Sequence, residues 1–211
     1  MKRKTKRRIM ALVMAALMVV GLIPTGFAAK AVSAANNVYT FDASKETAIT
    51  TAEKKADIAA GKYGTEGYFT LSGKVTRGNS STFSAELAKG ADDKEEGALT
   101  FTVTGTADVV VTATSTGSTN TSDLALVDAS GNKIDGIKAV TGTKPETEIK
   151  YTNLAAGTYS IIAPKDGENN RGVRVLSAVV TEIAAAVVTS DYTFDASAET
   201  AITTAEKKAD I

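Results

Sequence analysis

The chain has 211 residues, in which 24 lysines and arginines balance 24 aspartates and glutamates, and it contains neither cysteine nor histidine. The absence of both residue types excludes disulfide bonds, zinc sites built from cysteine and histidine, and catalysis by Ser-His-Asp or Cys-His arrangements. Carboxylate chemistry and calcium sites with oxygen ligands stay open.

The first 34 residues have the pattern of a secretory signal peptide. A basic stretch at residues 2–8 precedes an apolar run at residues 9–23, and small residues follow, with Val32-Ser33-Ala34 as the expected cleavage site. The apolar run is shorter than the ~20 residues that a membrane-spanning helix needs, which disfavours a membrane anchor. We therefore interpret residues 1–34 as a signal peptide and expect a secreted or cell-surface protein of a Gram-positive bacterium.

Removal of this segment changes the charge balance. Residues 1–34 hold seven of the 24 basic residues and none of the acidic ones, so the remainder carries 17 positive and 24 negative charges, a net charge of −7. Nucleic acids and anionic membranes bind clustered lysines and arginines. We therefore expect neither as a partner.

A nearly identical repeat sets the domain length. Residues 39–58 read YTFDASKETAITTAEKKADI and residues 192–211 read YTFDASAETAITTAEKKADI, so 19 of 20 positions match at an offset of 153 residues. The repeat indicates tandem copies of one module at residues 37–183, a linker at 184–191 and the truncated start of a second copy at 192–211. We expect the protein to continue beyond Ile211.

The module is predicted to begin with one short helix. Thr50 and Glu53 fit a capping box, residues 52–60 are good helix formers, and Gly61 is the expected end.

Beyond this point the hydrophobic pattern alternates with period two. Strands are expected around the buried sets 83–87, 99–103 and 109–113, and again at 123–127, 148–151, 158–162 and 173–180, with turns between them. Phe69, Phe83 and Phe101 are predicted to lie in the core. Short strands with regular turns predict an all-β fold, a jelly-roll-like β-sandwich.

Three segments carry a resemblance to a known group. Residues 99–118, 154–162 and 171–180, in this order, resemble the non-catalytic, carbohydrate-binding-like sandwich modules attached to secreted pectate lyases and other polysaccharide-degrading enzymes. The resemblance covers roughly residues 68–181 and implies a polysaccharide ligand, with pectin preferred. Many modules of the group carry an asparagine and an aromatic residue in the closing strand, where this chain has Arg171 and Arg174. This difference favours an anionic sugar.

Six residues are candidate carbohydrate ligands. The arginine fork pairs with carboxylates, which distinguish galacturonate from neutral sugars, although ion pairs within the domain are an alternative role. A lysine adds charge, a tyrosine offers a stacking face or packs internally, and loop asparagines bind hydroxyls or only shape turns. The candidates are Arg171, Arg174, Tyr68, Lys74, Asn120 and Asn170.

No cofactor is expected. The acidic residues of segment 92–96 could hold calcium but lack the spacing of a defined calcium loop, so a solvated hairpin tip is the alternative. No spacing singles out a catalytic carboxylate pair, and we therefore expect no enzymatic activity in these residues.

Three hypotheses remain open. The first is a carbohydrate-binding module repeated for avidity. The second is a structural spacer or adhesion module of a bacterial surface protein. The third adds a downstream catalytic domain, such as a polysaccharide lyase or glycoside hydrolase.

Overall fold

A computed structural model describes residues 30–32, 35–88, 92–142, 144–169, 171–184 and 187–189. The chain divides into two compact units, of which one is Ala34–Ala185. In the other unit, β1 (Lys30–Val32) pairs antiparallel with β14 (Val187–Thr189). Most of the expected signal peptide and the whole second copy at 192–211 lie outside the described residues. Within the described ranges, no helix is long and apolar enough to cross a membrane.

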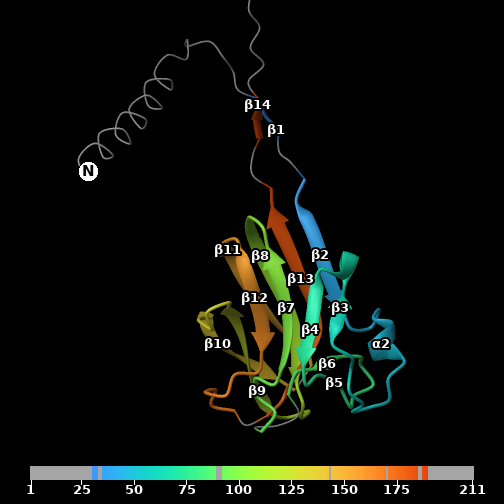
Figure 1. Ribbon diagram of the computed structural model, residues 1–211. Coiled ribbons are helices and arrows are strands. Elements are labelled where there is room, and N and C mark those ends of the chain that lie inside the picture. The colour runs from blue at the N-terminus through green and yellow to red at the C-terminus, as the bar shows by residue number, and fades with distance from the viewer. Residues whose placement is uncertain are drawn as a thin grey trace, which may run out of the picture. The chain divides into compact units, whose positions relative to one another are not determined.

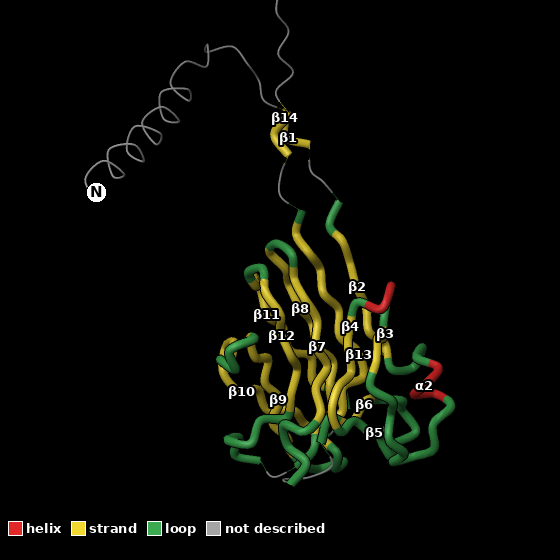
Figure 2. Tube along the Cα trace, in the orientation of Figure 1, coloured by secondary structure: helices red, strands yellow, loops and turns green. Residues whose placement is uncertain are grey.

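The unit Ala34–Ala185 is a jelly-roll-like β-sandwich of two antiparallel sheets (Figures 1 and 2). The first sheet has the order β10 (Lys133–Thr141), β9 (Thr121–Asp128), β12 (Gly157–Ile162), β7 (Gly97–Val103), β4 (Phe69–Gly73), β3 (Gly61–Tyr63). The second has the order β11 (Thr147–Leu154), β8 (Thr106–Ser115), β13 (Val173–Ile183), β6 (Ala85–Glu86), β5 (Thr76–Arg77), and β2 (Asn37–Asp42) also pairs with β13. The all-β prediction is confirmed.

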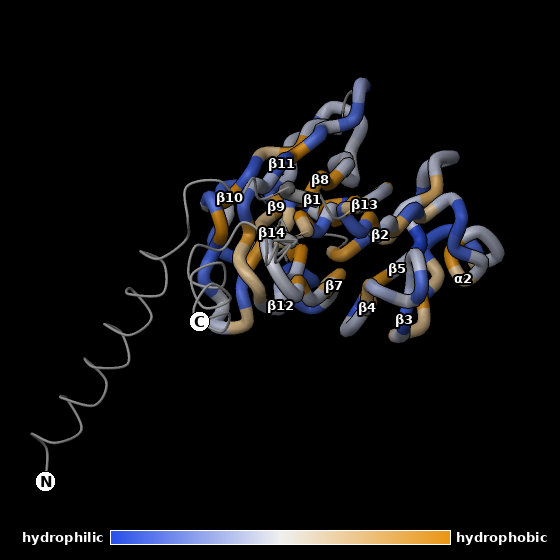
Figure 3. Tube along the Cα trace, turned by 90° about the horizontal axis from the view of Figure 1, so that it is seen from above, coloured by the Kyte–Doolittle hydropathy of each residue, from blue (hydrophilic) through white to orange (hydrophobic). Residues whose placement is uncertain are grey.

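The core lies between the sheets and follows the predicted alternation. Leu99, Phe101 and Val103 of β7 are buried, as are Val109 and Val111 of β8, while the intervening residues are more exposed. Hydrophobic residues recur along the strands of both sheets (Figure 3). Alternation therefore identified the inner face of these strands.

An aromatic cluster fills one part of the core. The Phe101 ring lies 5.9 Å from Phe69 and 5.9 Å from Tyr159, measured between ring centroids. Phe69 and Phe101 are buried as predicted, whereas Phe83 is only half-buried and lies beneath the Arg77 guanidinium. Phe83 therefore packs against the core without being fully enclosed by it, so its core prediction holds only in part.

The short helix exists, but not where it was predicted. The helix α2 spans Thr47–Thr50, and residues 52–60 form turns and a β-bridge instead. The Ile58 N–H donates to Val75 O and the Arg77 N–H donates to Ala56 O, so this segment lies along β5 as an additional edge. Lys55 adopts a φ of 66°, which no α-helix allows. Tertiary pairing has overridden helix propensity here.

Replacing Lys55 with glycine distinguishes the observed turn from the predicted helix. At a positive φ, glycine removes the steric penalty of the side chain, so Lys55→Gly is expected to stabilise the protein by up to ~1 kcal/mol. Inside a helix the same change would destabilise it by ~1 kcal/mol. Urea unfolding gives the sign directly, and a loss of stability would contradict the observed backbone.

Candidate functional site

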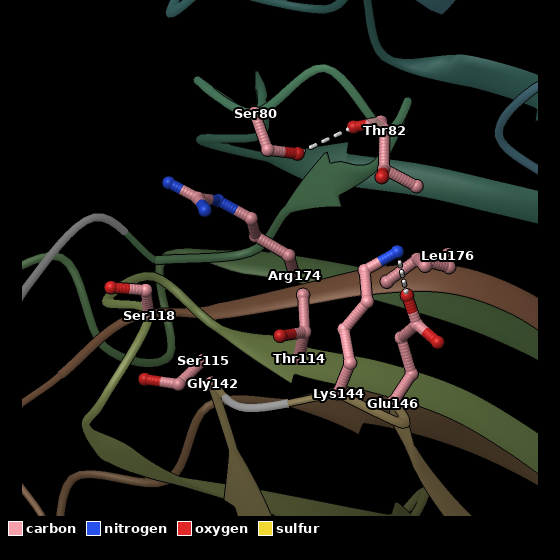
Figure 4. A pocket seen from close by; sticks show the side chains of 10 residues that line it. All are labelled: Ser80, Thr82, Thr114, Ser115, Ser118, Gly142, Lys144, Glu146, Arg174 and Leu176. Atoms are coloured by element: carbon pink, nitrogen blue, oxygen red, sulfur yellow. Dashed lines mark hydrogen bonds and ion pairs between the residues drawn. The ribbon is translucent and has the colours of Figure 1, made fainter.

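A pocket of ~150 Å³, lined mainly by residues with polar side chains, lies where β8 and β13 meet three loops. Its walls come from β8, β13 and the loops β5–β6, β8–β9 and β10–β11, and Figure 4 shows the side chains. The lining residues are Ser80, Thr82, Thr114, Ser115, Ser118, Gly142, Lys144, Glu146, Arg174 and Leu176. We call this the Arg174 pocket.

The sheet itself positions Arg174. In the strand register Arg174 lies between Glu86 of β6 and Thr114 of β8, so the three side chains share one face. Its neighbours Val173 and Val175 point into the core, which turns Arg174 outward. In Figure 4 its side chain extends between Ser80 and Ser118.

A buried carboxylate fixes the orientation of the guanidinium. Arg174 Nε donates to Glu86 Oε2 at 2.8 Å, and the two side chains are only 12% and 5% exposed. The terminal nitrogens of Arg174 make no hydrogen bond to any residue in the described part of the chain. Glu86 therefore holds the fork while its outer edge stays open to a ligand.

Two hydroxyl groups of the pocket, those of Ser80 and Thr114, present lone pairs rather than protons. Ser80 Oγ donates to Thr82 O at 2.7 Å, and Thr114 Oγ1 donates to Thr141 O at 3.2 Å. Each hydroxyl has one hydrogen, so both oxygens offer only acceptor sites to a ligand.

The buried Ser115 hydroxyl is engaged within the protein. The Ser122 hydroxyl donates to Ser115 Oγ at 2.6 Å, and the Gly117 N–H donates to the same oxygen at 3.4 Å. A ligand that brings hydrogen-bond donors to Ser80 Oγ and Thr114 Oγ1 therefore suits the pocket.

An exposed ion pair lies at the rim. Lys144 Nζ is 3.3 Å from Glu146 Oε1, and the lysine side chain is 80% exposed. The Glu146 carboxylate accepts a hydrogen bond from the backbone N–H of Glu146 and lies near the Lys144 ammonium. Both contacts hold the pKa of Glu146 below its ordinary value. Because surface pairs of this kind contribute little to stability, Lys144 is available to turn toward an anionic ligand.

Two of the predicted candidates belong to this region. Arg174 lines the pocket, and Asn120 supports its wall because the Gly142 N–H donates to Asn120 O at 2.8 Å. Arg171 is exposed at the start of the segment leading into β13 and does not line the pocket. Asn170 lies outside the described residues.

Tyr68, which was predicted as a carbohydrate ligand together with Arg174, lies far from the Arg174 pocket. Its hydroxyl donates to Thr102 O at 2.6 Å and approaches Glu182, which is eight residues from Arg174 along β13, or roughly 26 Å. Its ring stacks on Tyr39 with a centroid distance of 3.7 Å. Burial, reinforced by Glu182, raises the pKa of Tyr68. The ring is therefore part of the internal packing.

Lys74 is also engaged elsewhere. Its ammonium group pairs with Asp93 and lies 3.5 Å from Glu96 Oε2. The loop 92–96 is solvated at Asp92, Glu95 and Glu96, which are exposed. It is also anchored to the sandwich, because the buried Lys94 ammonium donates to Asn169 O and the Glu95 N–H donates to Ala163 O. Across the described residues, no group of three acidic side chains is placed to hold a metal ion.

The pocket contains residues that sequence reasoning missed. Ser80, Thr114, Ser118 and Lys144 line it but were not among the candidates. Serines and threonines in alternating strands look like ordinary half-buried positions, so the pattern alone carries no signal that separates them.

No family model matches the chain, and no curated protein matches it. Among solved structures, the chain is similar to the CBM22-1 xylan-binding domain from Paenibacillus barcinonensis Xyn10C, with 11% identity, a TM-score of 0.37, and coverage of 64% of this chain and 100% of that one. It is similar to the CBM36-1 domain of a multidomain xylanase from the hindgut metagenome of Trinervitermes trinervoides (12%, TM-score 0.35, 72% and 100%). It is also similar to the exo-beta-1,3-galactanase Pc1,3Gal43A from Phanerochaete chrysosporium (14%, TM-score 0.36, 70% and 29%).

Proposed function

We propose that residues 37–183 form a non-catalytic carbohydrate-binding module, with the Arg174 pocket as its ligand site. The observation that carries this proposal is the hydrogen-bonding pattern of the pocket: an oriented guanidinium edge lies beside the Ser80 and Thr114 hydroxyl oxygens, whose protons are already committed. A sugar ring supplies hydroxyl donors to such oxygens and offers acceptors to the arginine. Leu176 adds an apolar surface for the C–H groups of the ring.

A pectic polysaccharide is the ligand class that we favour. Galacturonate combines a carboxylate, which suits Arg174 and Lys144, with hydroxyl donors, which suit Ser80 and Thr114. A bare anion brings no hydroxyl donors, and a neutral sugar offers the two cationic side chains only uncharged acceptors, which bind them more weakly than a carboxylate does. In this proposal the module is secreted, follows a signal peptide and precedes a second copy, and the parent protein degrades polysaccharides through a domain elsewhere in the chain.

A spacer or adhesion function is the second candidate, and one observation favours it. Among the described residues, the large hydrophobic side chains that are strongly exposed are Val38 and Ile183, and neither is aromatic. Sugar-binding surfaces commonly offer an open aromatic ring for stacking. A module without such a surface also suits a purely mechanical role.

Affinity electrophoresis against polygalacturonate, methylated pectin, xylan and β-glucan tests the proposal. Polygalacturonate is expected to retard the chain, and Lys144→Glu is expected to weaken binding roughly 10-fold or more, since a hydrogen bond between charged groups contributes ~1.5–3 kcal/mol. This substitution leaves the core untouched because Lys144 is exposed.

Lys150→Glu is the matched control. Lys150 is an exposed lysine of β11 that pairs with Glu148 at 3.0 Å and does not line the pocket. Both substitutions change the net charge equally, so general repulsion of a polyanion affects them alike. If no polysaccharide retards the chain, the spacer function is favoured. If both variants lose retardation equally, the Arg174 pocket is not the ligand site.

A further inference from the structure

Gly78, the first residue of the β5–β6 loop, lies directly against the Arg174 side chain. The loop spans residues 78–84 and forms one wall of the Arg174 pocket. A Cβ atom added at Gly78 would lie 3.0 Å from Arg174 Cδ and 3.1 Å from Arg174 Nε, and it would overlap Ser84 Oγ. The Arg174 side chain therefore occupies the space that a side chain at position 78 would need.

Space, rather than backbone conformation, is what requires glycine at position 78. Gly78 does not adopt a positive φ, so its backbone is open to other amino acids. Its N–H donates to Ser84 O at 3.1 Å, and its carbonyl oxygen accepts a hydrogen bond from Arg77 Nη1 at 3.0 Å. Both polar groups of the Gly78 backbone are thus engaged, which holds this backbone in place.

The Arg77 side chain that holds Gly78 is itself fixed. Arg77 is only 6% exposed, and its guanidinium carbon lies 4.9 Å from the centroid of the Phe83 ring. The electrons of an aromatic face attract a cation placed over it, so the contact ties the two ends of the β5–β6 loop together. Gly78 is therefore unable to move away from Arg174 without breaking these contacts.

Arg174 is held from another side by Glu86. The hydrogen bond from Arg174 Nε to Glu86 Oε2 fixes the same nitrogen that an added Cβ at position 78 would press on. Glu86 supplies the attraction and Gly78 supplies the room. The direction of the terminal guanidinium nitrogens depends on both.

We propose that Gly78 is a positioning residue of the Arg174 pocket. The missing side chain at this position sets where the Arg174 fork meets the carboxylate of a pectic sugar. This inference rests on the proposed function for the identity of the ligand. The position of the guanidinium itself can be tested in the free protein.

Ser84 allows the two contacts of an added Cβ to be separated. The residue is 1% exposed, and its Oγ makes no hydrogen bond within the described part of the chain. Ser84→Ala therefore removes the overlap with a Cβ at position 78 without breaking a hydrogen bond. The close contacts of that Cβ with Arg174 remain.

Gly78→Ala, alone and combined with Ser84→Ala, tests the proposal in the full chain. NMR follows hydrogen exchange at Arg174 Nε in the free protein, and a titration with trigalacturonate gives the affinity. Both variants are expected to exchange this hydrogen about 10-fold faster or more and to bind the sugar about 10-fold more weakly, because the hydrogen bonds of the charged groups lose their alignment. If Gly78→Ala alone does not fold, the double variant provides both readouts.

Gly105→Ala is the matched control. It makes the same change at an exposed turn between β7 and β8, where nothing lies within 4 Å of an added Cβ. Its effect on the unfolded chain is the same, so any general consequence of replacing glycine appears here as well. Neither the exchange at Arg174 Nε nor the affinity for trigalacturonate is expected to change.

Three results overturn the proposal. The first is exchange at Arg174 Nε in Gly78→Ala as slow as in the unchanged chain. The second is recovery of slow exchange in the double variant, which would assign the effect to Ser84. The third is unchanged affinity for trigalacturonate in both variants. If the unchanged chain does not bind trigalacturonate, the proposed ligand is wrong, and the exchange readout still decides whether Gly78 positions Arg174.

Discussion

Replacing Arg174 with alanine is expected to destabilise the sandwich by about 3–5 kcal/mol, because it leaves the buried Glu86 carboxylate without its partner. The Glu86 side chain is 5% exposed in the intact protein, so its charge depends on the hydrogen bond from Nε. Urea unfolding measures the loss. The same variant is expected to lose polysaccharide binding. A loss of binding reports on the pocket only if the variant still folds.

A double substitution separates the two effects. Arg174→Met with Glu86→Leu removes both charges together and is expected to recover most of the lost stability, since apolar pairs commonly replace buried ion pairs without cost. In our account it still does not bind polygalacturonate. Arg171→Ala, at an exposed position, is expected to change stability by no more than ~0.5 kcal/mol. A large loss at Arg171 or none at Arg174 would contradict the assigned burial.

Replacing Phe101 with alanine is expected to destabilise the protein by about 3–5 kcal/mol, the usual cost of emptying a buried phenylalanine site. Phe101 is 1% exposed and lies among Phe69, Tyr68 and Tyr159. Its strand β7 pairs with β12 from Val103 opposite Gly157 to Ala98 opposite Ile162, so the cavity can close only in part. Thermal and urea unfolding both report the change.

Phe83→Ala is the control for this prediction. Phe83 is half-buried and its ring contacts the Arg77 guanidinium, with 4.9 Å between the guanidinium carbon and the ring centroid. Its loss is expected to be clearly smaller than that of Phe101→Ala. Equal losses of stability in the two variants would mean that the buried aromatic cluster around Phe101 contributes no more to stability than the half-buried Phe83 ring.

The strands were predictable where local pattern and tertiary burial agree. Alternating residues in β7 and β8 marked the buried face correctly. β10 escaped detection because Asp135 and Gly136, with φ values of 53° and 71°, form a bulge that breaks the alternation. The helix was predicted at the wrong place because residues 55–58 form backbone hydrogen bonds with residues 75–77, and the local sequence pattern gives no sign of these bonds.

Of the Arg174 pocket, only the charged residue Arg174 was predicted from the sequence. Arg174 was identified from the chemistry of its side chain, and the structure places it in a pocket. Its partner Glu86 lies 88 residues away in the chain, and the hydroxyl groups come from three separate segments, the β5–β6 loop, β8 and the β8–β9 loop. Long-range pairing of strands brings these groups together, so composition and spacing could not reveal them.

An NMR titration of the isotope-labelled chain with trigalacturonate tests the central claim most directly. The account predicts saturable shifts of the backbone amides around the Arg174 pocket, at Ser80, Thr82, Ser118, Gly142 and Lys144. The absence of shifts at millimolar sugar, or shifts confined to Tyr39 and Tyr68 at the other end of β13, would contradict it.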